Sequence, residues 1–272
     1  MQSEHKVALI TGAGHGIGKA SAKLMAARGW TVAINDLKPE FVEEAVSEIT
    51  AEGGKAIPVV RNVATREGVY AAVKAVTDAA GQLDVMVNNA AWVRYQAIPD
   101  IAPETVDRML QIGFNGVIWG TQAAAEVMDE TRGGAIVNVA SAAGFRSAPR
   151  SLVYSGIKAG VMGMTRAAAA ELGARNIRVN AVAPSAIPTE GTQKHRNADL
   201  DAKRIASTPL GRLGTVEDIA YHGIDLVAHV RAAGTSIAAR IPAARVGETV
   251  PQPGQPVFCV WEPEYSRVLP LN

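Results

Sequence analysis

The sequence predicts a doubly wound α/β fold, in which a parallel sheet is covered by helices on both faces. Short runs rich in β-branched residues alternate with longer, Ala-rich stretches of helical character. The short runs are apolar throughout, which is typical of parallel strands buried on both faces. A Gly-rich turn at residues 11–18 joins the first run to the first helical stretch. This order of elements is the pattern of α/β folds.

Each element follows from a local signal. The first helix should stop before Gly29, since glycine favours the end of a helix, and Pro39 suits the first turn of the second helix. We expect strands at residues 6–11, 31–36, 55–60, 83–88, 135–139 and 177–182. We expect helices at residues 16–28, from residue 39 onward, and at residues 65–80, 103–130 and 152–175.

Composition indicates a globular protein with one main domain, residues 1–220. Of the 272 residues, 48% are hydrophobic and 19% charged, enough for a sizeable core. The net charge of +1 argues against a nucleic-acid surface as the main function. No apolar run precedes Lys6 and no run is long enough to span a membrane. The lone cysteine, Cys259, fits a reducing compartment, so we expect a cytoplasmic protein.

The regular pattern ends near Ala220. Residues 221–272 form an atypical C-terminal segment, and residues 251–256, with three prolines, have the composition of irregular chain. We expect at most one short strand there, at residues 257–261. Composition leaves open whether this segment is a genuine variant or the product of a shifted reading frame.

The Gly-rich turn predicts a site for a dinucleotide in a Rossmann fold. Glycines let a pyrophosphate approach the backbone, where the start of a helix offers N–H groups and a positive dipole end. Asp36 ends the second strand, where a carboxylate accepts bonds from a ribose and repels a 2′-phosphate. We therefore expect NAD rather than NADP, although Lys38 lies close by. The turn residues expected at the cofactor are Gly12, Gly14, His15, Gly16, Ile17 and Gly18.

Tyr154 and Lys158 predict an acid–base pair. They lie four residues apart on one helical face, and a nearby cation favours a phenolate and lowers the pKa of a tyrosine. Ser141 follows a predicted strand and places a hydroxyl at the same edge of the sheet. Asn88, Asn89 and Ala90 end the preceding strand, with polar groups suited to holding loops around a cofactor.

These motifs, in this order and spacing, resemble the short-chain dehydrogenases/reductases. The resemblance implies that Tyr154 exchanges the proton on the substrate oxygen and that Ser141 orients this oxygen. It implies that Lys158 binds the nicotinamide ribose and that Asn115 holds a water of the proton relay. Further cofactor contacts implied by the resemblance are Asn62, Val63, Asn89, Ala90, Tyr154, Pro184, Ile187 and Thr189.

The sequence departs from the family pattern in a few places. Asn62 stands where an Asp is frequent, and Ala91 and Ser185 stand where glycines are frequent. The larger departure is the C-terminus, because the final strand that family members form after a last helix is not recognisable here.

The predicted function is an oxidoreductase that interconverts a secondary alcohol and a ketone by hydride transfer with NAD. The expected substrate loops, residues 91–98, 142–151 and 185–210, carry Trp92, Tyr95 and Phe145, which favours a hydrophobic substrate. Two alternatives stay open: a nucleotide-sensing binding protein without turnover, and an epimerase on the same fold. We expect no metal site, and a homo-oligomer, either a dimer or a tetramer.

Overall fold

The computed structural model describes residues 5–147, 149–189, 197–207, 212–216, 226–232 and 235–241, with the backbone alone for Leu200, Ser207 and the last two ranges. The chain divides into two compact units, Met1–Gly223 and Ile224–Asn272. Each unit is described here by itself.

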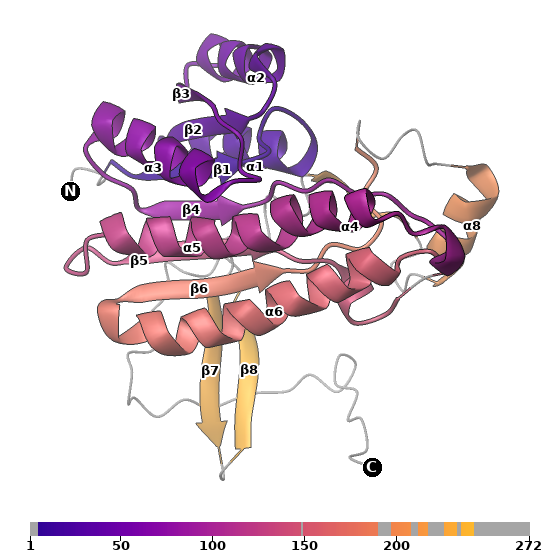
Figure 1. Ribbon diagram of the computed structural model, residues 1–272. Coiled ribbons are helices and arrows are strands. Elements are labelled where there is room, and N and C mark those ends of the chain that lie inside the picture. The colour runs from indigo at the N-terminus through magenta and orange to yellow at the C-terminus, as the bar shows by residue number, and fades with distance from the viewer. Residues whose placement is uncertain are drawn as a thin grey trace. The chain divides into compact units, whose positions relative to one another are not determined.

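The first unit is built on a parallel sheet of six strands in the order β3-β2-β1-β4-β5-β6 (Figure 1). The strands are β1 (Val7–Thr11), β2 (Thr31–Asp36), β3 (Lys55–Val60), β4 (Val85–Asn88), β5 (Gly134–Val139) and β6 (Ile177–Val182). The six expected strands are confirmed, with ends that differ by at most two residues. The doubly wound fold is therefore confirmed as well.

Helices connect successive strands. They are α1 (Gly16–Ala27), α2 (Pro39–Ala51), α3 (Arg66–Ala80), α4 (Pro103–Leu110), α5 (Gly116–Val127), α6 (Leu152–Leu172) and α8 (Ala198–Ser207). Short 3₁₀ turns lie at Ile98–Asp100, Ala142–Gly144 and Gly173–Arg175. Helix α3 shows why the boundaries fall where they do: the Thr65 hydroxyl caps its start by accepting a bond from Gly68 N, and Gly81 ends it in the left-handed conformation.

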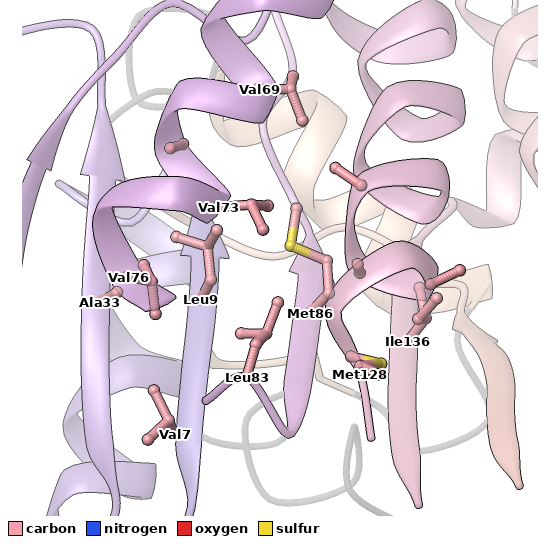
Figure 2. Close-up of a cluster of buried hydrophobic side chains, with 14 of the residues drawn as sticks. Val7, Leu9, Ala33, Val69, Val73, Val76, Leu83, Met86, Met128 and Ile136 are labelled. Atoms are coloured by element: carbon pink, nitrogen blue, oxygen red, sulfur yellow. The ribbon is translucent and has the colours of Figure 1, made fainter. Parts of the chain in front are cut away.

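Helices α3, α5 and α6 lie side by side over one face of the sheet (Figure 1). Val69, Val73 and Val76 of α3 point at Leu9 and Met86 of the central strands (Figure 2). Their spacing of three and four residues is the apolar stripe of an amphipathic helix. This core holds β1 and β4 firmly, and both strands end at the candidate site.

The helical region expected at residues 103–130 is not one helix. A π-helical turn, Gln111–Asn115, separates α4 from α5. Immediately after it, a Cβ at Gly116 would lie 3.0 Å from the Val63 carbonyl oxygen, so the start of α5 runs against the loop that follows β3. Single π-helical turns are frequent at functional sites, and this one carries Asn115.

The C-terminal unit contains an antiparallel pair that the sequence analysis missed. Strand β7 (Leu226–Ala232) pairs with β8 (Thr235–Ile241), in a region that we expected to be irregular. Both strands contain β-branched or aliphatic residues scattered among alanines and polar residues, a weak signal that the nearby glycines and prolines obscured. The strand expected at residues 257–261 lies outside the described residues.

Candidate active site

The candidate residues gather at the carboxyl edge of the parallel sheet. Parallel pairing brings the ends of neighbouring strands to one edge, and Asn88 of β4 is in register with Asn138 of β5. The loops after β1, β4, β5 and β6 therefore meet there. Ligands of open α/β sheets bind at this edge.

The Gly-rich turn after β1 fits a dinucleotide phosphate. Gly12 and Gly16 adopt positive φ angles of 62° and 60°, which glycine reaches without strain. A Cβ at Gly18 would lie 2.5 Å from Gly12 O and 2.6 Å from Asn89 Nδ2, so only glycine fits there. The helix α1 that follows has no acidic residue in its first turn, and its N-cap residue, His15, provides no side-chain cap. The positive end of α1 therefore favours an anion.

Asn89 and Thr11 brace this turn. The Asn89 amide donates to Thr11 O at 2.8 Å and to Gly12 O at 3.0 Å. The Thr11 hydroxyl in turn accepts from Asn89 N and Ala90 N. The side chain of Asn89 thus holds the cofactor turn in shape, and Thr11 is a positioning residue that the motif alone did not single out.

Asp36 stands at the end of β2 and faces the same turn. Its Oδ1 accepts from Leu37 N at 2.8 Å and Lys38 N at 3.4 Å, and its Oδ2 accepts from Gly14 N at 3.3 Å. Burial opposes ionisation of this carboxyl, but His15 and the amides of Lys38 and Leu37 outweigh it and lower the pKa of Asp36. The group is therefore an anion at neutral pH.

The structure brings Ser141, Tyr154 and Lys158 together. Ser141 leads into a 3₁₀ turn after β5, and its hydroxyl accepts from Ala143 N at 3.1 Å and donates to Pro184 O at 3.5 Å. The same hydroxyl lies close enough to the Tyr154 phenol to affect the pKa of that group. Lys158 lies one turn after Tyr154 on α6, with its ammonium 5.8 Å from the centroid of the Tyr154 ring. It is 3% exposed and donates to Val139 O at 2.6 Å.

The pKa of Tyr154 differs from the expectation. Burial raises this pKa above its ordinary value of 10, and a neighbouring tyrosine, Tyr95, adds to the effect, while only the Ser141 hydroxyl lowers it. The expected decrease caused by Lys158 is wrong for this structure, since the ammonium is engaged with the Val139 carbonyl. Burial also lowers the pKa of Lys158 from 10.5 to about 8.

Asn115, Asn62 and Val63 lie near the start of α5. Asn115 is partly buried in the π-helical turn, and its amide makes no hydrogen bond within the described part of the chain. The side-chain oxygen of Asn62, Oδ1, accepts a hydrogen bond from Ala64 N at 3.0 Å, which fixes the loop after β3. Val63 lines a cavity of about 10 Å³, the size of one water molecule, together with Thr11, Asn88, Ala90, Ile112, Gly116 and Val117.

Pro184, Ile187 and Thr189 belong to the segment after β6. Pro184 is buried, and its carbonyl accepts from Ala142 N at 2.9 Å, which ties this segment to the loop that carries Ser141. Thr189 lies beside the start of α1, because a Cβ at Gly16 would lie 3.5 Å from the Thr189 Cβ. The segment thus runs from the loop that carries Ser141 to the Gly-rich turn.

A buried polar chain links the three elements that carry the site. Asn88 of β4 donates to Asn138 Oδ1 of β5 at 2.9 Å, and Asn138 donates to the Thr165 hydroxyl of α6 at 3.0 Å. Sequence analysis missed Asn138 and Thr165. The available signal was an amide inside an otherwise apolar strand, which costs free energy unless it is hydrogen-bonded.

Gly18→Ala tests the fit of the Gly-rich turn. Because the new Cβ would meet backbone and the Asn89 amide, we expect NADH to bind about tenfold more weakly, in the range that overpacking costs. Titration of NADH fluorescence measures this. The matched control is Gly173→Ala, where a Cβ meets nothing within 4 Å. Equal affinities in both variants and the unsubstituted protein would contradict the assignment of this turn.

Among the described residues, no helix combines the length and apolar character that a membrane span requires. The described residues also contain no group of three or more His, Cys, Asp or Glu side chains that could hold a metal ion.

Comparisons with known proteins agree with this geometry. The family model for short chain dehydrogenase matches residues 6–200. The 3-oxoacyl-[acyl-carrier-protein] reductase FabG of Thermotoga maritima is 40% identical over 220 residues, covering 81% of this chain and 89% of the reductase. A second relative is the (2S)-[(R)-hydroxy(phenyl)methyl]succinyl-CoA dehydrogenase subunit BbsD of Thauera aromatica, which is 38% identical over 220 residues. The match covers 81% of this chain and 88% of the subunit.

A solved structure is also similar to this chain. The 7α-hydroxysteroid dehydrogenase complexed with NADH and 7-oxo glycochenodeoxycholic acid superposes with a TM-score of 0.76 and 30% identity, covering 79% of this chain and 84% of that one.

The C-terminal segment is similar to a different family. The family model of the TOBE domain matches residues 204–269, which include β7 and β8. This second match begins where the dehydrogenase match ends and accounts for the departure from the dehydrogenase pattern. With the match over residues 6–200, the chain belongs to the short-chain dehydrogenases, oxidoreductases that use a nicotinamide cofactor and act on small molecules.

Proposed function

We propose that the protein interconverts a secondary alcohol and a ketone with NAD as the cofactor. The observation that carries the proposal is the placement of Tyr154, close to the Ser141 hydroxyl and one turn from Lys158, at the sheet edge that also holds the Gly-rich turn. A pure binding protein has no need for this set of three side chains.

The residues divide the chemistry among themselves. The bound nicotinamide supplies or accepts the hydride. Tyr154 gives a proton to the substrate oxygen during reduction and takes it back during oxidation, while the Ser141 hydroxyl orients that oxygen. Lys158 would bind the nicotinamide ribose from its buried position on α6. Asn115, whose amide has no partner within the described residues, is suited to hold a water that passes the proton to solvent.

Several residues support binding of the cofactor. The backbone of Gly12 to Gly18 and the start of α1 would hold the pyrophosphate, and Asn62 and Val63 would border the adenine. Ala90 would lie along the cofactor, and Pro184, Ile187 and Thr189 would contact the carboxamide. The anionic Asp36 supports NAD over NADP, since a carboxylate repels a 2′-phosphate. The related hydroxysteroid dehydrogenase was solved with NADH.

Two loops, residues 91–98 and residues 142–151, support an apolar, ring-bearing substrate. Tyr95 lies edge-on to the Tyr154 ring, with centroids 5.9 Å apart, and the loops are joined by a bond from Gln96 N to Arg150 O. Phe145 is 73% exposed on the second loop, so it is free of core packing. Ring-bearing compounds also appear in the names of the Thauera aromatica subunit and the hydroxysteroid dehydrogenase complex.

The cofactor assignment predicts a preference that can be measured. Catalytic efficiency should be at least about tenfold higher with NAD than with NADP, about 1.4 kcal/mol. Asp36→Ala should reduce this ratio, because it removes the charge that repels the 2′-phosphate. Initial rates at 340 nm with each cofactor give the ratio. Equal or better use of NADP by the unsubstituted protein would overturn the choice of NAD.

A homo-oligomeric assembly and a cytoplasmic location stay predictions from the sequence.

A further inference from the structure

The two loops of residues 91–98 and 142–151 hold a local concentration of positive charge. They carry three exposed arginines, Arg94, Arg146 and Arg150, and no acidic residue. Among the contacts of the described residues, none of these guanidinium groups has a carboxylate partner or a side-chain hydrogen bond. The whole chain has a net charge of only +1, so the charge of these loops is not a property of the surface as a whole.

Helices α1 and α2 show the contrasting arrangement. Lys19 of α1 is paired with Glu44 and Glu48 of α2, so that the positive charge is neutralised within the protein. The acidic residue nearest in sequence to the two loops is Asp100, and within the described residues its carboxylate contacts none of the three arginines. The charge of the loops is therefore available to a ligand.

Both loops border Tyr154. Tyr95, which follows Arg94, stands edge-on to the Tyr154 ring with centroids 5.9 Å apart. A hydrogen bond of 3.0 Å from Gln96 N to Arg150 O joins the first loop to the second. Arg150 lies four residues before Tyr154 and directly before the start of α6. The arginines thus belong to the two segments that lie beside the proposed acid–base.

Arg150 has a backbone conformation that an arginine rarely adopts. Its φ angle is 69°, and among the described residues Asn176 is the only other non-glycine residue with a positive φ. Asparagine visits the left-handed region readily, whereas an arginine there costs free energy. Residues that keep such a conformation cluster at ligand-binding and active sites. The conformation of Arg150 is therefore a second indication, independent of its charge, that this turn serves a ligand.

Exposed apolar side chains lie on the same segments. Of the eight large hydrophobic residues that are exposed in the described part of the chain, four are Tyr95, Ile98, Phe145 and Leu152. The first three belong to the two loops, and Leu152 begins α6 directly after them. Exposed apolar groups beside unpaired cations fit a ligand that has both an apolar body and a negative charge.

We propose that the substrate carries an anionic group, a carboxylate or a phosphate ester, and that the three arginines of these loops hold this group while the reacting carbon lies at Tyr154. Guanidinium groups match carboxylate and phosphate oxygens with two parallel N–H bonds. The exposed apolar side chains receive the body of the substrate. The inference rests on the proposed function, because it places an alcohol or ketone at Tyr154.

Binding of matched ketones to the protein with NAD bound tests the proposal without turnover, because the oxidised cofactor cannot reduce a ketone. The probes are 4-acetylbenzoate, 4-acetylphenyl phosphate and the neutral methyl 4-acetylbenzoate, measured by isothermal titration calorimetry. We expect at least one anion to bind about tenfold more tightly than the ester, the scale of two or three exposed ion pairs. The tighter of the two anions identifies the group that the arginines accept.

Variants locate the effect. Arg94→Gln and Arg150→Gln should each lose about threefold in affinity for the anion, the scale of one exposed ion pair, and none for the ester. The matched control is Lys55→Gln, which makes the same change of charge at the exposed first residue of β3 and should leave both affinities unchanged. Because the two arginines lie on different loops, either variant serves as the test if the other fails to fold.

Failure of both anionic ketones to bind more tightly than the ester, or an equal loss in Lys55→Gln, would overturn the proposal. Absorbance at 340 nm with the corresponding secondary alcohols and NAD separates this result from failure of the proposed function. Tight binding of an anionic ketone without oxidation of its alcohol would support the anion site and refute the oxidoreductase activity at Tyr154. Equally efficient oxidation of the anionic and neutral alcohols would overturn the anion site and leave the proposed function standing.

Discussion

Replacing Tyr154 by phenylalanine should remove most turnover while leaving NADH affinity nearly unchanged. The phenol is the proposed acid–base at the substrate oxygen, and general acid–base catalysis contributes about 10²–10⁴ in rate. The phenylalanine ring keeps the contact with Tyr95 and the packing of α6, so the fold should stay intact. Steady-state rates and NADH fluorescence titration measure the two effects separately.

Ser141→Ala is the informative control for this variant. It removes an orienting hydroxyl rather than the proton donor, so we expect a smaller loss of rate than in Tyr154→Phe. Because the Ser141 hydroxyl lowers the pKa of Tyr154, its loss should shift the rise of the oxidation rate with pH to higher pH. Near-normal turnover in Tyr154→Phe would refute the proposed mechanism and favour the alternative of a nucleotide-sensing binding protein without turnover.

Lys158→Met should abolish most activity and yet stabilise the protein without cofactor. The substitution removes the group proposed to bind the nicotinamide ribose, so both rate and cofactor affinity should fall. It also removes a buried charge. The decrease in the pKa of Lys158 from 10.5 to about 8 corresponds to about 3 kcal/mol of destabilisation at pH 7. Loss of the bond to Val139 O offsets about 1 kcal/mol of that gain.

The pH dependence of this stabilisation has a definite sign. The pKa of Lys158 is lower in the folded protein, so between about pH 8 and 10.5 the unfolded chain binds more of this proton than the folded protein does. The cost of the buried ammonium is complete below about pH 8 and disappears as pH rises toward 10.5. Urea unfolding at pH 7 should therefore show Lys158→Met to be about 2 kcal/mol more stable, and the difference should shrink at pH 10. A variant that is less stable at pH 7, or fully active, would contradict this account.

Sequence patterns were sufficient for the sheet, and they singled out candidate residues that the structure brings together at its carboxyl edge. The strands are short, apolar and bounded by turn residues, so periodicity located all six of them. Glycine spacing identified the turn after β1, and the interval of four residues placed Tyr154 and Lys158 on one helical face. These features are local, which is why a single sequence reveals them.

The features that escaped prediction depend on tertiary contacts. The π-helical turn at Gln111–Asn115 lies where α5 meets the Val63 carbonyl, a contact between distant parts of the chain. The raised pKa of Tyr154 depends on burial by loops that the sequence does not place. The bond between Asn138 and Thr165 joins residues on separate elements. The β7–β8 pair lies in a segment that resembles a different kind of domain, so the pattern of the dehydrogenase gave no guidance there.

Absorbance at 340 nm, recorded with NAD and a panel of secondary alcohols that includes cyclic and aryl compounds, tests the central claim most directly. We expect a substrate-dependent rise in NADH that reverses when the matching ketone is supplied with NADH, and that Tyr154→Phe nearly eliminates. If NADH binds but no alcohol or ketone changes the absorbance, the protein is a nucleotide-binding protein without turnover. If a substrate is inverted at its carbon centre with no net change in NADH, the protein is an epimerase. Either of these results would contradict the proposed function.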